Sequence, residues 1–74
     1  LQLYPNPAND YIIIKSRNGY LQNIEIRNLN GQRLGSFKAS GEQTELDLST
    51  LNPGLYILEV ETDTGFVSSK LLVE

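Results

Sequence analysis

Apolar and polar residues alternate with a period of two along most of the chain. In residues 21–27, for example, Ile24 and Ile26 fall on one face of an extended segment, while Asn23 and Glu25 fall on the other. This pattern is typical of a β-strand that buries one face against a core. The same alternation predicts seven short strands, over residues 1–4, 11–15, 21–27, 32–38, 43–48, 55–62 and 66–73.

Turn-forming residues separate the predicted strands. Arg17-Asn18-Gly19 and Asn30-Gly31 contain Asn-Gly pairs, which favour the positive φ angles of tight turns. Residues 49–54 form a longer corner, and Asp63-Thr64-Gly65 closes a final hairpin. These turns leave no uninterrupted segment for a helix of ten or more residues. The sequence therefore predicts an all-β fold, a small seven-stranded antiparallel sandwich of immunoglobulin-like type, in a single domain over residues 1–74.

Two prolines lie between the first two predicted strands. Pro5 and Pro7 each fix their own φ and lack an N–H donor, and each biases the preceding residue, Tyr4 or Asn6, toward extended backbone. The segment is therefore predicted to form a rigid extended corner that leads into the strand at residues 11–15. On an edge strand, such prolines would also prevent pairing with a neighbouring chain.

The composition excludes several classes of function. The net charge is −3, and the six Lys and Arg residues are scattered singly, whereas nucleic-acid binding requires clustered positive charge. No apolar run approaches the ~20 residues of a membrane-spanning helix. The chain has no cysteine and no histidine, so neither a Ser-His-Asp nor a Cys-His arrangement can form, and zinc lacks its usual ligands. We therefore expect no enzyme, no cofactor, no metal and no direct membrane insertion.

The acidic residues offer only weak candidates for chemistry. The pairs Glu45/Asp47 and Glu59/Glu61 lie two residues apart within strands, the position of solvated side chains opposite a core. Asp10 and Asp63 lie at turns and are possible oxygen ligands for calcium, but single acidic residues in turns more often cap the backbone.

Six aromatic residues are candidates for a sugar-stacking platform. Tyr56 lies in the most apolar strand, which places it in the core, and Tyr4 is expected to pack under the proline corner. The set comprises Tyr4, Tyr11, Tyr20, Phe37, Tyr56 and Phe66. A carbohydrate-binding or adhesion module of a large extracellular protein is therefore the alternative function, and a structural spacer is a second one.

Three blocks of sequence resemble a known family. The first is Tyr-Pro-Asn-Pro-Ala at residues 4–8, and the second is the strand–turn–strand at residues 24–34. The third runs from the corner at residues 48–54, through Gly54-x-Tyr56, to the terminal strand that ends in Lys70-Leu71-Leu72-Val73-Glu74. In this order and spacing the blocks resemble the C-terminal sorting domain of type IX secretion cargo proteins of Bacteroidota. The chain departs from the family in carrying a single basic residue, Lys70, near its end.

The resemblance implies a sorting signal rather than an enzyme. It implies a folded domain that the type IX translocon and an outer-membrane shuttle protein recognise after periplasmic transit, and that a surface sortase-like protease removes from secreted or surface-attached cargo. The terminal hairpin would be the recognition element, and exposed terminal strands make a dimer conceivable. The residues that the resemblance assigns to recognition are Tyr4, Pro5, Asn6, Pro7, Gly54, Tyr56, Lys70, Leu71, Leu72 and Val73.

Overall fold

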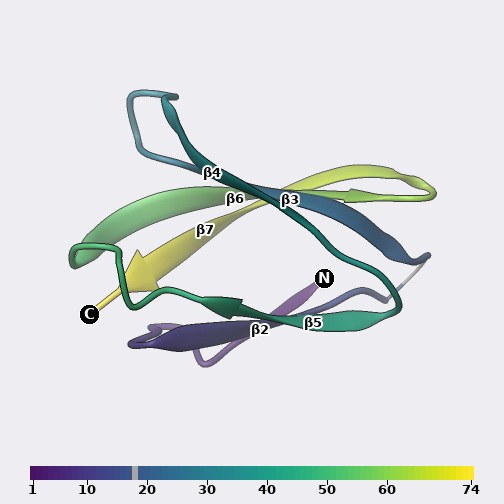
Figure 1. Cartoon of the computed structure of the whole chain (residues 1–74), viewed down its shortest axis with the longest axis horizontal. Coiled ribbons are helices and arrows are strands. Elements are labelled where there is room, and N and C mark those ends of the chain that lie inside the picture. Colours follow the sequence, from purple (N-terminus) through teal and green to yellow (C-terminus); the bar gives the residue numbers. More distant parts are fainter. Residues whose placement is uncertain (18) are drawn as a thin grey trace.

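The chain folds into two facing antiparallel sheets (Figure 1). The computed structural model describes residues 1–17 and 19–74, and these residues form seven strands and no helix. The strands are β1 (Gln2–Tyr4), β2 (Tyr11–Lys15), β3 (Leu21–Arg27), β4 (Arg33–Lys38), β5 (Gln43–Asp47), β6 (Gly54–Thr62) and β7 (Gly65–Val73). The predicted all-β sandwich is confirmed, with each strand boundary within one residue of the prediction. The predicted turn at Asn18 lies partly outside the described residues.

The two sheets differ in size. The smaller has the order β1-β2-β5 and the larger the order β4-β3-β6-β7, and every strand pair within them is antiparallel. In Figure 1 the larger sheet forms the upper layer, and β2 and β5 lie below it. β4 and β7 are therefore the edge strands of the larger sheet. None of the described residues forms a helix long and apolar enough to cross a membrane.

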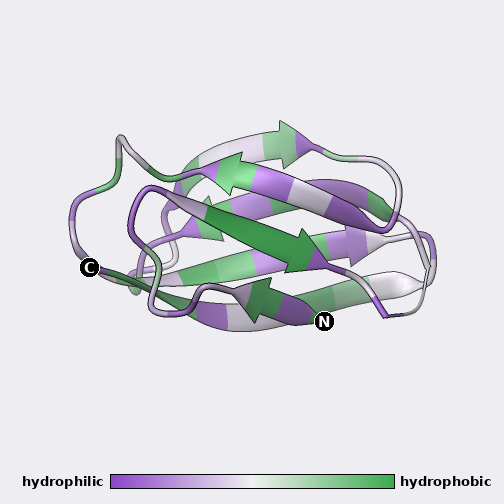
Figure 2. Ribbon diagram, turned by 90° about the horizontal axis from the view of Figure 1, so that it is seen from below, coloured by the Kyte–Doolittle hydropathy of each residue, from purple (hydrophilic) through white to green (hydrophobic). Residues whose placement is uncertain are grey.

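The core lies between the inner faces of the sheets. Apolar and polar positions alternate along several strands, as the colouring of Figure 2 shows, and the buried apolar residues form one core cluster. Burying each large aliphatic side chain contributes about 1.5–3 kcal/mol. Because the chain has no disulfide, this core carries most of the favourable free energy of folding. Its largest fully buried members are Ile12, Ile14, Ile24, Leu48, Leu58, Val60 and Leu71.

The edge strands of the larger sheet leave two inner-face side chains partly uncovered. Phe37 on β4 pairs with Ile24, and Val67 on β7 pairs with Val60, so both face the core side of the sheet. Nevertheless Phe37 is 39% exposed and Val67 45% exposed. Val67 therefore lies on the inner face of the sheet without being buried. An edge strand has a neighbour on one side only, so side chains on its inner face lack half of their lateral cover.

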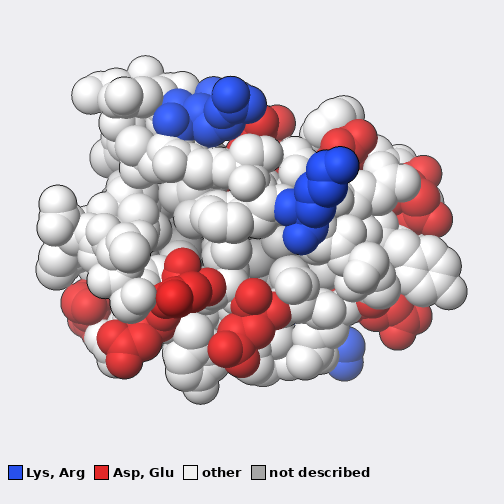
Figure 3. Space-filling model, in the orientation of Figure 1, with Lys and Arg blue, Asp and Glu red and all other residues white. Residues whose placement is uncertain are grey.

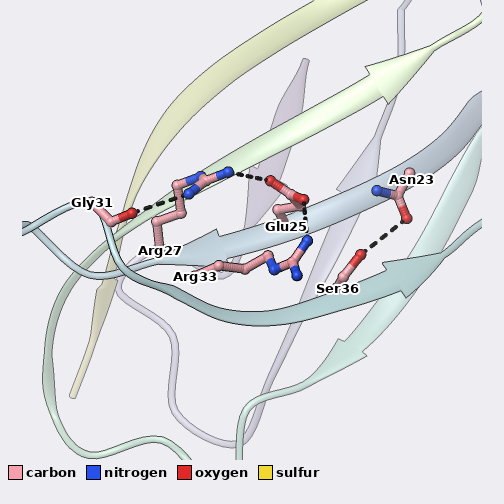
Figure 4. A network of polar contacts seen from close by, with 6 residues as sticks. All are labelled: Asn23, Glu25, Arg27, Gly31, Arg33 and Ser36. Atoms are coloured by element: carbon pink, nitrogen blue, oxygen red, sulfur yellow. Dashed lines mark hydrogen bonds and ion pairs between the residues drawn. The ribbon is translucent and has the colours of Figure 1, made fainter.

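A polar network covers the outer face of β3 and β4 (Figure 4). The Arg27 guanidinium donates to Glu25 Oε1 at 2.7 Å, and the Arg33 guanidinium donates to Glu25 Oε2 at 3.3 Å. A β-bulge makes this possible, since the register between the strands shifts after Ile26 and places Arg33 opposite Arg27. Hydrogen bonding from Arg33, supported by Arg27, lowers the pKa of Glu25 below its usual value of 4.5.

The Glu25 network predicts a pH-dependent stability. A carboxylate with a lowered pKa stabilises the fold above its unfolded-state pKa and loses that contribution as pH falls through its folded-state pKa. Backbone and side-chain hydrogen bonds from Ser49 lower the pKa of Asp47, which acts in the same direction. We expect Glu25→Gln to lower stability at pH 7 and to reduce, without abolishing, the loss between pH 5 and 3. Urea unfolding at these pH values measures the effect, and parallel pH profiles for the two proteins would contradict it.

A tyrosine hydroxyl fixes the corner before β6. Tyr56 is buried, and its hydroxyl donates to the Asn52 carbonyl oxygen at 2.5 Å. This hydrogen bond spans the corner that contains Pro53 and Gly54, in the manner of the tyrosine corners of β-sandwiches. The predicted core position of Tyr56 is confirmed.

Removal of the Tyr56 hydroxyl is expected to destabilise the fold moderately. Tyr56→Phe keeps the ring but leaves the Asn52 carbonyl without its protein donor, which costs about 0.5–1.5 kcal/mol. For a domain of this size, a loss of 1 kcal/mol lowers Tm by about 4–8 °C. Differential scanning calorimetry measures the shift, with the exposed Tyr20→Phe as the matched control. Equal Tm values for Tyr56→Phe and the unsubstituted chain would show that the hydrogen bond carries no net stability.

Candidate functional site

The first and last sequence blocks, far apart along the chain, lie side by side. The proline segment, residues 5–8, runs along the outer edge of β7. The Ala8 N–H donates to the Leu72 carbonyl at 2.8 Å, and the Glu74 N–H donates to the Ala8 carbonyl at 2.8 Å. Ala8 forms a parallel bridge with Val73 and is fully buried. The fold therefore brings the Tyr-Pro-Asn-Pro-Ala block against the end of the terminal strand.

The proline segment is bent rather than extended. Residues 5–7 form bends, and the Tyr4–Pro5 and Asn6–Pro7 peptide bonds are both cis. The sequence predicts a rigid extended corner, whereas residues 5–7 form a succession of bends, so the extended geometry of this prediction is wrong. Asn6 points its side chain toward the terminal strand, where its Oδ1 accepts from the Leu72 N–H at 3.4 Å. Pro5, Asn6 and Pro7 are exposed.

The remainder of the β7 edge is unpaired. Both main-chain groups of Leu72 face the proline segment. Because main-chain groups alternate in direction along a strand, those of Lys70, Ser68 and Phe66 point to the same side. In the described part of the chain these groups have no main-chain partner on that side, and only a long 3.5 Å contact from the Ser69 hydroxyl reaches the Lys70 carbonyl. We call these outward groups of Phe66, Ser68 and Lys70 the open edge.

The side chains beside the open edge are exposed and combine apolar and cationic character. Phe66 is 68% exposed, and Lys70 is exposed on the outer face, opposite Ile57. Within residues 1–17 and 19–74, Lys70 makes no ion pair. Figure 3 shows Asp and Glu side chains along the lower side of this face of the molecule, where the smaller sheet lies. The open edge is thus a strand-pairing surface with one unneutralised cation.

The structure divides the predicted recognition residues between surface and core. Leu71 and Val73 are buried, as is Tyr56, and Gly54 is half-buried at the corner. Leu72, by contrast, is 40% exposed. A recognition role for the buried residues would therefore act through the shape of the hairpin. The surface members of the set are Tyr4, Pro5, Asn6, Pro7, Lys70 and Leu72.

The six aromatic residues do not form one platform. Tyr4 and Tyr11 share the outer face of the smaller sheet with Ile13, because Tyr4 pairs with Ile13 and Tyr11 lies two residues before it. Tyr4 is 41% exposed there. Phe37 lies on the inner face of β4, where its ring is next to Gly35.

The acidic pairs lie on solvated sheet faces. Glu45 and Asp47 pair with Ile13 and Tyr11 on the outer face of the smaller sheet, and Glu59 and Glu61 alternate with buried residues of β6. The described residues contain no group of three or more acidic side chains that could hold a metal ion.

The two candidate calcium ligands show no sign of a shared site. The Asp63 carboxylate accepts from the Tyr20 N–H at 2.7 Å and so joins two loops rather than capping its own turn. Asp10 contributes its main-chain carbonyl, which accepts from the Leu48 N–H at 2.7 Å.

A known protein family matches almost the whole length of the chain. The family described as secretion system C-terminal sorting domain matches residues 2–74. No match was found among curated proteins. The matched range includes every strand, the proline segment and the open edge. The chain belongs to the family of type IX secretion C-terminal sorting domains, which are sorting signals rather than catalysts.

Proposed function

We propose that this chain is a non-catalytic secretion signal that directs its cargo protein across the outer membrane, and that it docks on the secretion machinery through the open edge of β7. The observation that carries the proposal is the unpaired stretch from Phe66 to Lys70, next to a proline segment that pairs with the rest of the strand. The family match supports the sorting role.

Strand addition is the mode of docking that this edge favours. A partner strand that pairs with an exposed sheet edge gains affinity from main-chain hydrogen bonds and specificity from alternate side chains. The bonds between Ala8 and Leu72 occupy the edge beyond Lys70. A partner strand would therefore pair with residues 66–70 and end near the Lys70 ammonium group.

The partner in this proposal is an outer-membrane shuttle protein that receives the folded domain in the periplasm. The cargo then reaches the cell surface or the medium, where a sortase-like protease removes the domain. The open edge gives such a shuttle a folded feature to bind, one that does not depend on the sequence of the cargo.

An export assay tests the sorting role. Residues 1–74 are fused to the C-terminus of a periplasmic fluorescent reporter in a type IX-competent bacterium, and surface and medium fluorescence are measured. The matched control is the same fusion in a translocon-deficient strain. We expect fluorescence outside the cell in the competent strain alone. Retention of a folded fusion in the periplasm of both strains would reject the proposal.

A further inference from the structure

A cavity of about 230 Å³ lies beside the open edge, at the end of the sandwich where β6 turns into β7. This volume is below the roughly 300 Å³ at which small-molecule sites begin, and it suits the side chain of a partner. It is the space that a further strand beside β7 would cover. The cavity is lined by Leu1, Ser16, Arg17, Thr62, Thr64, Gly65, Phe66 and Val67.

The walls of the cavity favour an apolar occupant. Leu1 and Val67 supply apolar side chains, and Val67 is 45% exposed although it faces the core side of the sheet. In the polar part of the wall, the Thr62 and Thr64 hydroxyls lie 3.0 Å apart in a hydrogen bond with each other. Ser16 and the exposed Arg17 complete that part of the wall. A partner side chain that covers Val67 gains from removing its apolar surface from water.

The other face of the open edge favours an acidic residue. Lys70 lies on the outer face, because it pairs with Ile57, whereas Val67 pairs with Val60 on the inner face. An added strand keeps this alternation, so its residue opposite Lys70 faces outward and its residue opposite Val67 faces the cavity. Opposite charges at directly facing positions stabilise a strand pair.

From this geometry we infer the side-chain pattern of the partner strand: a carboxylate opposite Lys70 and, three residues away, a large apolar side chain that enters the cavity over Val67. The inference rests on the proposed docking through the open edge. It adds the chemistry that selects the partner, because main-chain pairing alone accepts almost any extended sequence.

A tethered strand tests the pattern. An eight-residue strand with glutamate and phenylalanine three positions apart is joined to Leu1 through a flexible Gly/Ser linker, which gives an effective concentration in the millimolar range. Hydrogen exchange then measures the protection of the Phe66, Ser68 and Lys70 amides. We expect exchange at least tenfold slower than in the untethered chain. A mismatched strand, with lysine for glutamate and serine for phenylalanine, should give less than a third of that slowing.

Two substitutions test whether the apolar side chain of the tethered strand binds in the cavity. Val67→Asp places a charge in the cavity and should remove the protection that the matched strand gives. Phe37→Asp makes the same kind of change at the opposite edge of the sheet, where Phe37 is 39% exposed, and should leave the protection unchanged. Thermal unfolding of each variant checks whether the substituted domain is still folded.

The outcomes separate this inference from the proposal on which it rests. If matched and mismatched strands protect the amides equally, docking through the open edge stands and the side-chain pattern is wrong. If neither strand protects them, both are wrong. Protection that persists in Val67→Asp would show that the cavity is not the site of the apolar side chain.

Discussion

Export of a reporter fused to this domain is expected to fall at least tenfold when Ser68 is replaced by proline. The Ser68 N–H points away from β6 toward the open edge, so proline removes a donor that a partner strand needs and no bond within the domain. Proline is tolerated on an edge strand where its missing N–H would face solvent. The isolated Ser68→Pro domain should therefore unfold within a few degrees of the unsubstituted chain, as circular dichroism can measure.

Two neighbouring substitutions serve as controls for Ser68→Pro. Ser68→Ala keeps the N–H and should export normally. Ser69→Pro removes an N–H on the side that pairs with Leu58 in β6, and should unfold the domain. Normal export of a folded Ser68→Pro domain would show that the partner binds elsewhere.

The strands could be predicted from the sequence because their signals are local. Alternation of side chains and Asn-Gly turns depend on neighbouring residues, and Gly31, for instance, has a positive φ of 86° as its Asn-Gly pair predicts. The β-bulge shows the limit of this reasoning. Simple alternation from Gly35 would turn Arg33 toward the core, whereas the bulge turns it outward to Glu25.

The candidate site could be predicted only in part, since it depends on which strands become edges. Lys70 and Leu72 follow as exposed positions from their alternation with Leu71 and Val73. The pairing of Ala8 with β7 has no local signal, because it joins segments more than sixty residues apart. Within the Tyr-Pro-Asn-Pro-Ala block, no local signal therefore distinguishes Ala8 as the fully buried residue that holds the prolines against the strand. Likewise, Phe66, Val67 and Ser68 become candidates for strand pairing only once β7 is known to be an edge.

Substitutions at Leu71 and Leu72 distinguish an effect on the stability of the domain from an effect on its recognition by the partner. Leu71→Ala is expected to destabilise the domain by about 2–5 kcal/mol, because the side chain is fully buried and its removal leaves a cavity. Stabilities of about 0.05–0.15 kcal/mol per residue correspond to roughly 4–11 kcal/mol for 74 residues. A single truncation would thus remove a large part of the total, and export should fall with the folded fraction.

Leu72→Ala changes an adjacent residue of the same type that is 40% exposed, so its cost in stability should be below about 1 kcal/mol. Its main-chain groups are held by the proline segment in either variant. If the partner pairs with residues 66–70 as proposed, Leu72→Ala should export within twofold of the unsubstituted domain. Urea unfolding and the export assay, applied to both variants, measure the two effects separately. A stable Leu72→Ala domain that is not exported would extend the recognised surface past the open edge, to the outer face beside the proline segment.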